Sequence, residues 1–157
     1  MHEETKYLVK VCADSATLAV IGKAGYLNCR SVGEFFASVV DKGCKKIFVQ
    51  LKDCTGMDST FLGMIAGVAL KLKKSDGELT LLNPNERNLE LVENLGISKL
   101  VKISSDGASE TPSDALPSTS APTSAILDAH KNLIAADSSN LAKFEDVITF
   151  LKKENEA

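Results

Sequence analysis

Short β-rich runs alternate with amphipathic helical stretches through the first two-thirds of the chain, and this alternation limits the possible folds more than any other feature. After an N-terminal hairpin, the predicted order of elements is β-β-α-β-α-β-α-β. Strands that alternate with helices need right-handed crossovers and a mostly parallel sheet. The sequence therefore predicts an α/β fold with a mostly parallel sheet and helices packed on it.

The predicted strands are short apolar runs bounded by turn residues. They comprise a hairpin over residues 6–22, a buried central strand over 45–51 that Asp53 ends, and two further strands over 77–84 and 99–103.

Three stretches carry apolar side chains at three- and four-residue steps, the spacing of a helix with one buried face. They are residues 31–44, the stretch after Asp58, and residues 85–96. Ser31 and Glu34 fit a capping box at the first helix, although Asn28 could cap an earlier turn. Gly43 suits a left-handed helix end, and Gly96 is a helix terminator.

The composition changes after Ser104. Residues 105–124 hold three of the four prolines and almost no large apolar residue, so we expect a domain over 1–104 followed by a flexible linker. Residues 125–157 become helical again, in two helices broken near residues 136–140. An apolar stripe of Leu141, Phe144, Ile148 and Leu151 could fold back on the domain, pair with a second copy or bind a partner, and the sequence leaves all three open.

Charge and hydropathy exclude two classes of partner. The net charge is −3 and no basic patch combines with aromatic residues, which argues against nucleic-acid binding. No apolar run is long enough to span a bilayer, and the N-terminus lacks a signal-peptide pattern. We expect a cytoplasmic protein without membrane insertion.

The sequence offers little for catalysis. Its four cysteines form no CxxC pair and its two histidines are His2 and His130, so we expect no metal site and no cofactor. Residues 22–25 (GKAG) lack the spacing of a phosphate loop. Without a histidine-activated nucleophile or a paired-carboxylate site, an enzyme is the last of our hypotheses.

Asp58, Ser59 and Thr60 stand where the second helix begins. Asp58 suits the N-cap, where its carboxylate accepts free backbone N–H groups. Ser59 then occupies the first helical position. A phosphate there would meet N–H groups and the positive end of the helix dipole, so the fold would tolerate it while a partner would not. Ser59 can equally be an ordinary first-turn serine.

The segment 45–68, KKIFVQLKDCTGMDSTFLGMIAGV, resembles the signature of STAS domains, the anti-sigma factor antagonists. The order of elements over residues 6–103 is similar as well. The resemblance implies partner switching: the unphosphorylated protein binds an anti-sigma factor serine kinase, phosphorylation of Ser59 releases it, and a serine phosphatase reverses the reaction. The linker and the C-terminal helices lie outside the resemblance.

The resemblance also implies partner contacts near Ser59. Asp58 would orient the serine and contact the kinase, and Thr60 could be a secondary site. Phe61 replaces a small residue of the family pattern and either anchors a partner or packs inward. Asn28 stands where the family often has an acidic residue, and Asp53 lies on the same loop edge.

Two hypotheses of different class follow. The first is a phospho-switch binding module of the anti-sigma factor antagonist type. The second is a phosphorylation-independent STAS accessory subunit or scaffold of a larger signalling or transport complex, which binds through the same helix edge.

Overall fold

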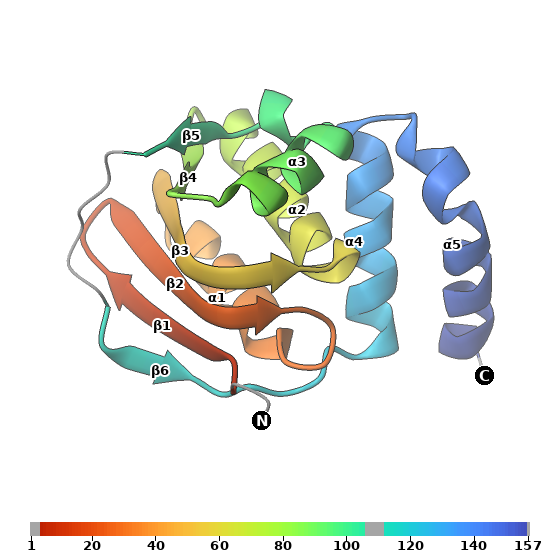
Figure 1. Cartoon of the computed structure of the whole chain (residues 1–157), viewed down its shortest axis with the longest axis horizontal. Helices are drawn as coiled ribbons and strands as arrows, with labels where there is room; N and C mark the ends of the chain where they lie inside the picture. Colours follow the sequence, from red (N-terminus) through yellow and green to blue (C-terminus); the bar gives the residue numbers. More distant parts are fainter. Residues whose placement is uncertain (1–3, 106–111, 157) are drawn as a thin grey trace.

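A six-stranded sheet forms the centre of the computed structural model, which describes residues 4–105 and 112–156 (Figure 1). The strands are β1 (Lys6–Val11), β2 (Ser15–Ala24), β3 (Lys46–Met57), β4 (Glu78–Leu82), β5 (Lys102–Ser104) and β6 (Asp114–Leu116). Their order across the sheet is β5-β4-β3-β2-β1-β6. The β2–β3, β3–β4 and β4–β5 pairs are parallel, whereas β1 is antiparallel to both neighbours. The predicted α/β class and the mostly parallel sheet are confirmed.

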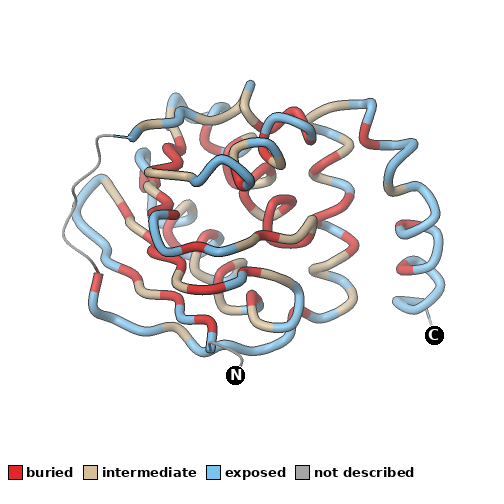
Figure 2. The backbone as a smooth tube through the Cα atoms, viewed as in Figure 1, coloured by how far each residue is buried: buried red, intermediate tan, exposed pale blue. Residues whose placement is uncertain are grey.

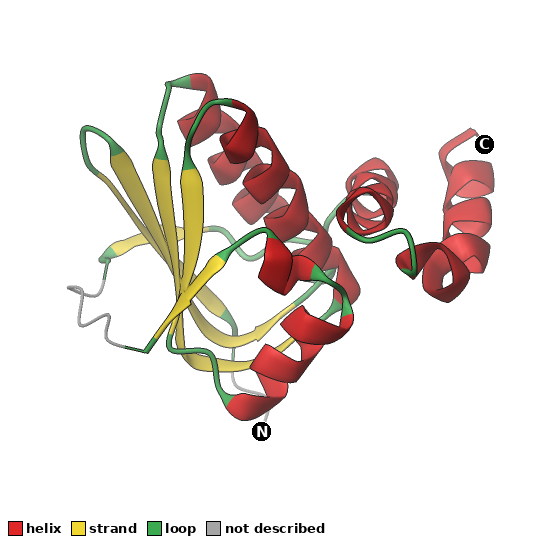
Figure 3. Ribbon diagram, turned by 90° about the horizontal axis from the view of Figure 1, so that it is seen from above, coloured by secondary structure: helices red, strands yellow, loops and turns green. Residues whose placement is uncertain are grey.

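The helices gather on one side of the sheet, as the view in Figure 3 shows. They are α1 (Arg30–Asp41), α2 (Ser59–Lys74), α3 (Glu86–Asn94), the short 3-10 helix η1 (Ile97–Lys99), α4 (Thr123–Ala136) and α5 (Asn140–Glu156). Helix α4 packs on α2, and α5 packs on α4, so the two C-terminal helices extend outward from the domain.

The main core lies between the sheet and its helices, where buried positions concentrate on the central strands and on the inner helix faces (Figure 2). Its apolar side chains come from strand positions that alternate in burial and from the inward stripe of each helix. The largest fully buried side chains include Tyr7, Leu18, Ile47, Leu51, Phe61, Leu62, Ile65, Leu72, Leu79 and Leu81.

The boundaries of the first helix agree with the sequence at its end but not at its start. Gly43 has a φ angle of 86°, the left-handed conformation predicted for it, and Gly96, predicted to end a helix, has a φ angle of 72°. The predicted capping box is wrong: α1 begins at Arg30 and has no side-chain cap at Cys29. The Arg30 N–H instead donates to the Thr119 carbonyl at 3.1 Å, so a distant segment satisfies part of this helix start.

Two strand boundaries differ from prediction. Strand β3 continues past Asp53 to Met57, because the long β2 pairs with it as far as Ala24 opposite Met57. The predicted strand over 99–103 is replaced by η1 and the shorter β5. The length of a strand depends on how far its neighbour pairs with it, and a run of apolar residues does not indicate this length.

The described part of the predicted linker carries a strand that the sequence analysis did not expect. In β6, Leu116 pairs with Tyr7 and Asp114 with Val9, which extends the sheet beyond β1. Further along, the Ala121 N–H donates to the Tyr26 carbonyl at 2.7 Å. Residues 112–122 therefore lie along β1 and the start of α1.

The C-terminal stripe folds back within the chain, the first of the three possibilities considered. Ile148 and Leu151 are buried against Leu127 of α4, and Phe144 packs beside them. Leu141 does not share this contact and is 50% exposed. Among the described helices, none joins the length and the unbroken hydrophobicity that a bilayer crossing requires.

Candidate functional site

Asp58 joins the start of α2 to the loop between β2 and α1. Its Oδ1 accepts from the Phe61 N–H at 3.0 Å, which is the N-cap bond expected from the sequence. Its Oδ2 accepts from the Tyr26 N–H at 2.8 Å, a contact that the sequence could not indicate. Gly25 makes room for this carboxylate, since a Cβ there would lie 2.6 Å from Oδ2.

Asn28 fixes the shape of the same loop. Its Oδ1 accepts from the Gly25 N–H at 3.1 Å and from the Tyr7 hydroxyl, and its Nδ2 donates to the Lys23 carbonyl at 3.0 Å. Asn28 therefore caps no helix and closes a turn instead. The loop presents Tyr26 and Leu27 outward, 49% and 64% exposed.

Ser59 occupies the first position of α2, as predicted, and is half-buried. Its Oγ lies 2.9 Å from Nε2 of His130 on α4. Nδ1 of that ring lies 2.7 Å from the Ile126 carbonyl. A carbonyl oxygen can only accept, so Nδ1 carries a hydrogen and donates it to Ile126, while Nε2 faces the serine hydroxyl.

His130 is the residue near the site that sequence reasoning missed. The sequence indicates no histidine placed to act on a nucleophile, because 71 residues separate His130 from Ser59. His130 is 4% exposed and its ring packs edge-on against Phe144, with ring centroids 5.1 Å apart. Neither of the two cavities described below is lined by Ser59 or His130.

Thr60 and Phe61 lie inside the fold. Thr60 is 3% exposed, and Phe61 is fully buried with its ring stacked on Tyr7, the centroids 6.3 Å apart. Phe61 thus packs inward, which was one of its two expected positions.

Asp53 lies apart from the other predicted residues. It is an exposed position within β3, opposite Ile21 of β2, and does not line the cavity beside Asp58.

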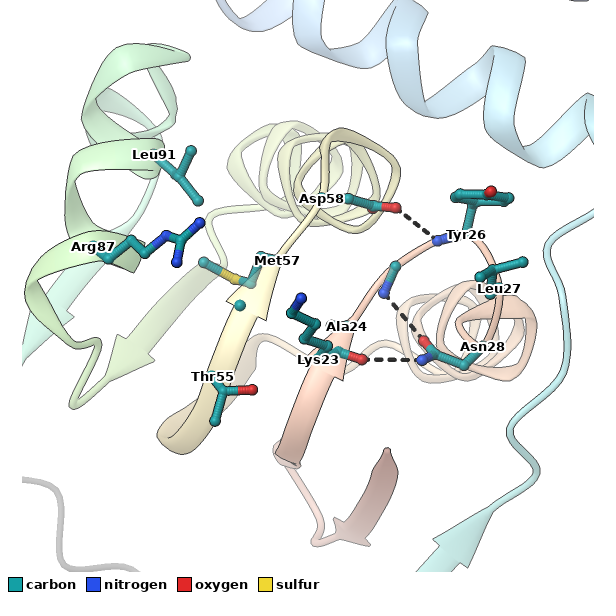
Figure 4. Close-up of a pocket in the computed structure, with 12 residues that line it drawn as sticks. Lys23, Ala24, Tyr26, Leu27, Asn28, Thr55, Met57, Asp58, Arg87 and Leu91 are labelled. Atoms are coloured by element: carbon teal, nitrogen blue, oxygen red, sulfur yellow. Dashed lines mark hydrogen bonds between the residues drawn. The ribbon is translucent and has the colours of Figure 1, made fainter. Parts of the chain in front are cut away.

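A cavity of about 320 Å³ lies between the β2–α1 loop, the end of β3 and α3 (Figure 4). Asp58 and Asn28 reach it from one side and Arg87 from the other, with Met57 between them. Within the described residues, no group of three or more His, Cys, Asp or Glu side chains could hold a metal ion.

Two buried thiols flank the site. Burial, followed by the nearby Asp58 carboxylate, raises the pKa of Cys29 to about 12. Burial also raises the pKa of Cys54, whose Sγ lies 3.3 Å from the Gly56 carbonyl. Both thiols stay protonated near neutral pH, as structural cysteines do.

Comparison with known proteins connects this geometry to a family. A model of the STAS domain matches residues 9–109, which leaves α4 and α5 outside the match. A Thermotoga maritima protein provisionally named an anti-sigma factor antagonist is 32% identical over 68 residues, covering 43% of this chain and 60% of that one. The anti-sigma-B factor antagonist of Bacillus subtilis is 41% identical over 54 residues, covering 34% and 50%. The chain thus spans 50 to 60% of the length of these curated relatives.

Solved structures agree on the fold. A crystal structure of a Thermotoga maritima protein, provisionally described as an anti-sigma factor antagonist, is similar with a TM-score of 0.53 at 26% identity, covering 63% of this chain and 86% of that one. The unphosphorylated form of the anti-sigma factor antagonist SpoIIAA gives a TM-score of 0.55 at 15% identity, with 65% and 89% covered. At that identity the second likeness shows the fold alone.

Proposed function

This chain belongs to the STAS domain family, and from that premise we propose that it is a phospho-switch binding module of the anti-sigma factor antagonist type. In this proposal the unphosphorylated protein binds an anti-sigma factor serine kinase. Phosphorylation of Ser59 releases the complex, and a serine phosphatase restores the binding form. The protein acts in the cytoplasm, as a substrate of these enzymes and without catalysis of its own.

One observation carries this proposal: Ser59 is a half-buried serine at the first position of α2, directly after the Asp58 cap. A phosphate on Oγ would add roughly −1.5 to −2 charges beside the Asp58 carboxylate. The positive end of the α2 dipole offsets part of that charge inside the fold. A partner surface that accepts one carboxylate has no such compensation, so the added charge weakens the complex.

The exposed β2–α1 loop supplies the partner contact in this proposal. Tyr26 and Leu27 present apolar surface beside Asn28 and Asp58, which is the combination that binding interfaces favour. The buried Thr60 and Phe61 support this surface from beneath, and Asp53 would contact only a partner that extends along β3.

The first experiment maps phosphopeptides of the protein purified from its own cells, in growth and under stress. We expect phosphate on Ser59 in an amount that differs between the two conditions. Absence of phosphate from Ser59 in both conditions would contradict the switch.

A binding measurement then tests the charge itself. Ser59→Asp should weaken binding to the anti-sigma factor serine kinase of this proposal by at least roughly tenfold, which corresponds to about 1.4 kcal/mol. Ser38→Asp, on the exposed side of α1, adds the same charge away from the site and should bind like wild type. Equal affinity of wild type and Ser59→Asp would remove the charge mechanism.

The accessory-module alternative has its own support in the Ser59–His130 contact. A serine whose hydroxyl is held by a buried histidine can serve the packing of α4 alone. In that case Ser59→Ala would alter stability and leave partner binding as it is.

We also propose the division of the chain into a STAS domain over 1–104, a connecting segment over 105–124 and a helical segment over 125–157. The family match to residues 9–109 supports the first boundary.

A further inference from the structure

Helix α4 approaches α2 at two positions where α2 has no side chain. A Cβ on Gly63 would lie 2.7 Å from the Ala129 Cβ and closer still to the Ala129 carbonyl. A Cβ on Gly67 would lie 2.9 Å from Cγ of Asn132. Ser59, Gly63 and Gly67 follow one another at four-residue steps, so they form one stripe along α2. We call this stripe of one serine and two glycines the glycine stripe, after the two glycines that let α4 approach.

Hydrogen bonds set the register of α4 on this stripe. The Ser59–His130 bond lies at one end, and Asn132 Nδ2 donates to the Gly63 carbonyl at 3.2 Å. The surface therefore accepts a helix that carries a small residue opposite Gly63 and a hydrogen-bonding side chain opposite Ser59.

Both ends of α4 are held to the domain. Just before its first residue, the Ala121 N–H donates to the Tyr26 carbonyl at 2.7 Å. Between the two ends, a cavity of about 610 Å³ lies between α1, α2 and α4, with Phe36, Met64 and Ala125 in its wall. The other end is anchored: Leu133 is fully buried, and Lys99 Nζ lies 3.0 Å from Asp137 Oδ2. Hydrogen bonds from Ser139 and Lys99 lower the pKa of Asp137, so its charge persists at neutral pH.

Helices α4 and α5 also have a small apolar cluster of their own. Leu127, Ile148 and Leu151 pack together, separate from the main core. The two helices can therefore remain in contact with each other when α4 leaves α2.

We propose that α4 is a displaceable occupant of a helix-binding surface on α2, the glycine stripe, and that it withholds Ser59 while docked. The occupant is α4 of the same chain. The Ser59 hydroxyl is engaged by His130 in the docked form, and an enzyme or partner that needs this hydroxyl meets it only after α4 lifts. A helix with the same small-residue and hydrogen-bonding pattern is the kind of partner that could replace α4.

Gly63→Ala is the variant that should lift α4. The new methyl group collides with the α4 backbone, whereas alanine is a better helix former than glycine and leaves α2 intact. Gly33→Ala is the matched control, because a Cβ there meets only the flexible end of Met64, 3.3 Å away. Gly67→Ala should act in between, since it displaces only the Asn132 side chain.

Amide hydrogen exchange measures the outcome in the full chain. We expect the α4 amides in Gly63→Ala to exchange at least about tenfold faster than in wild type, while the β3 and β4 amides are unchanged. Reaction of His130 with diethyl pyrocarbonate, followed by mass spectrometry, should rise in parallel. Gly33→Ala should match wild type in both readouts.

Three results would overturn the proposal. Unchanged α4 exchange in Gly63→Ala would mean that α4 does not dock through the stripe. Simultaneous loss of protection in α4 and β3 would mean that α4 is an inseparable part of the domain. A wild-type dimer with α4 exchanged between copies would assign the occupant to a second chain. None of these readouts needs phosphate on Ser59, so their failure is distinct from failure of the proposed switch.

Discussion

Asp58 couples two segments through a single carboxylate. One oxygen caps α2 at Phe61 and the other holds the Tyr26 N–H of the β2–α1 loop. A second negative charge on Ser59 would compete with Asp58 for the free N–H groups of this helix start. A change at the serine can therefore move the loop that presents the apolar surface, without any change in the core.

Two aromatic side chains near the site should respond in opposite ways to truncation. Phe61→Ala should lower the free energy of unfolding by about 3–5 kcal/mol, because it removes a fully buried ring. Tyr26→Ala should change it by less than about 0.5 kcal/mol and weaken partner binding, since that side chain is half exposed. Urea unfolding and a binding titration on both variants provide the check. Similar stabilities of the two variants would contradict the placement of Phe61.

The buried thiol of Cys29 should make stability depend on alkaline pH. Its pKa is about 12 in the folded state, against about 8.5 for a free thiol, so the unfolded chain loses this proton first. The contribution of this thiol to the free energy of unfolding is fully present below about pH 8.5. It is lost as the pH rises toward 12, by roughly 1.4 kcal/mol per pH unit for one such group. Cys29→Ser should remove about that much slope from a pH series of urea unfolding curves. An unchanged slope would place the thiol in solvent.

Among the elements, the presence of the helices was predicted better than the start of α1 and the end of β3. Apolar periodicity located α1, α2 and α3, because a helix with one buried face carries apolar residues at three- and four-residue steps in its own sequence. The start of α1 was mispredicted because Thr119, far along the chain, takes the place of a local cap. Strand β3 was cut short because its last residues are fixed by pairing with β2.

The candidate site, like the elements, was predicted from the sequence only where its features are local. Asp58 and Ser59 were placed correctly because the N-cap pattern is local. The Asp58 bond to Tyr26 and the Ser59 bond to His130 were not predicted, because each joins segments that only the folded chain brings together. Local patterns thus located the helix start, and tertiary contacts determined what faces it.

The joint between α4 and α5 depends on one buried amide. Asn140 Nδ2 donates to the Leu133 carbonyl at 2.7 Å and to the Leu95 carbonyl at 2.9 Å. Asn140→Ala should cost about 1–3 kcal/mol, because it leaves buried carbonyls without a partner. Thermal denaturation measures the loss, with the exposed Ser138→Ala as the comparison. Equal midpoints for the two variants would mean that water replaces the amide.

For the whole molecule, composition was a poor guide to what the segment after residue 104 does. A stretch rich in proline and serine can still pair through its backbone, and β6 does so along β1. This pairing covers the free edge of β1, which would otherwise be open to another strand. Residues 114–116 of the predicted linker therefore add a strand to the sheet.

The covalent connection between α2 and α4 has a consequence for any partner that arrives in trans. A tethered helix meets its site at an effective concentration on the order of millimolar. A free partner at about micromolar concentration must then bind the glycine stripe roughly a thousandfold more tightly than α4 does to occupy half of the molecules. In the displacement proposed above, the tail thereby sets an affinity threshold, and a ligand weaker than that threshold does not occupy the glycine stripe.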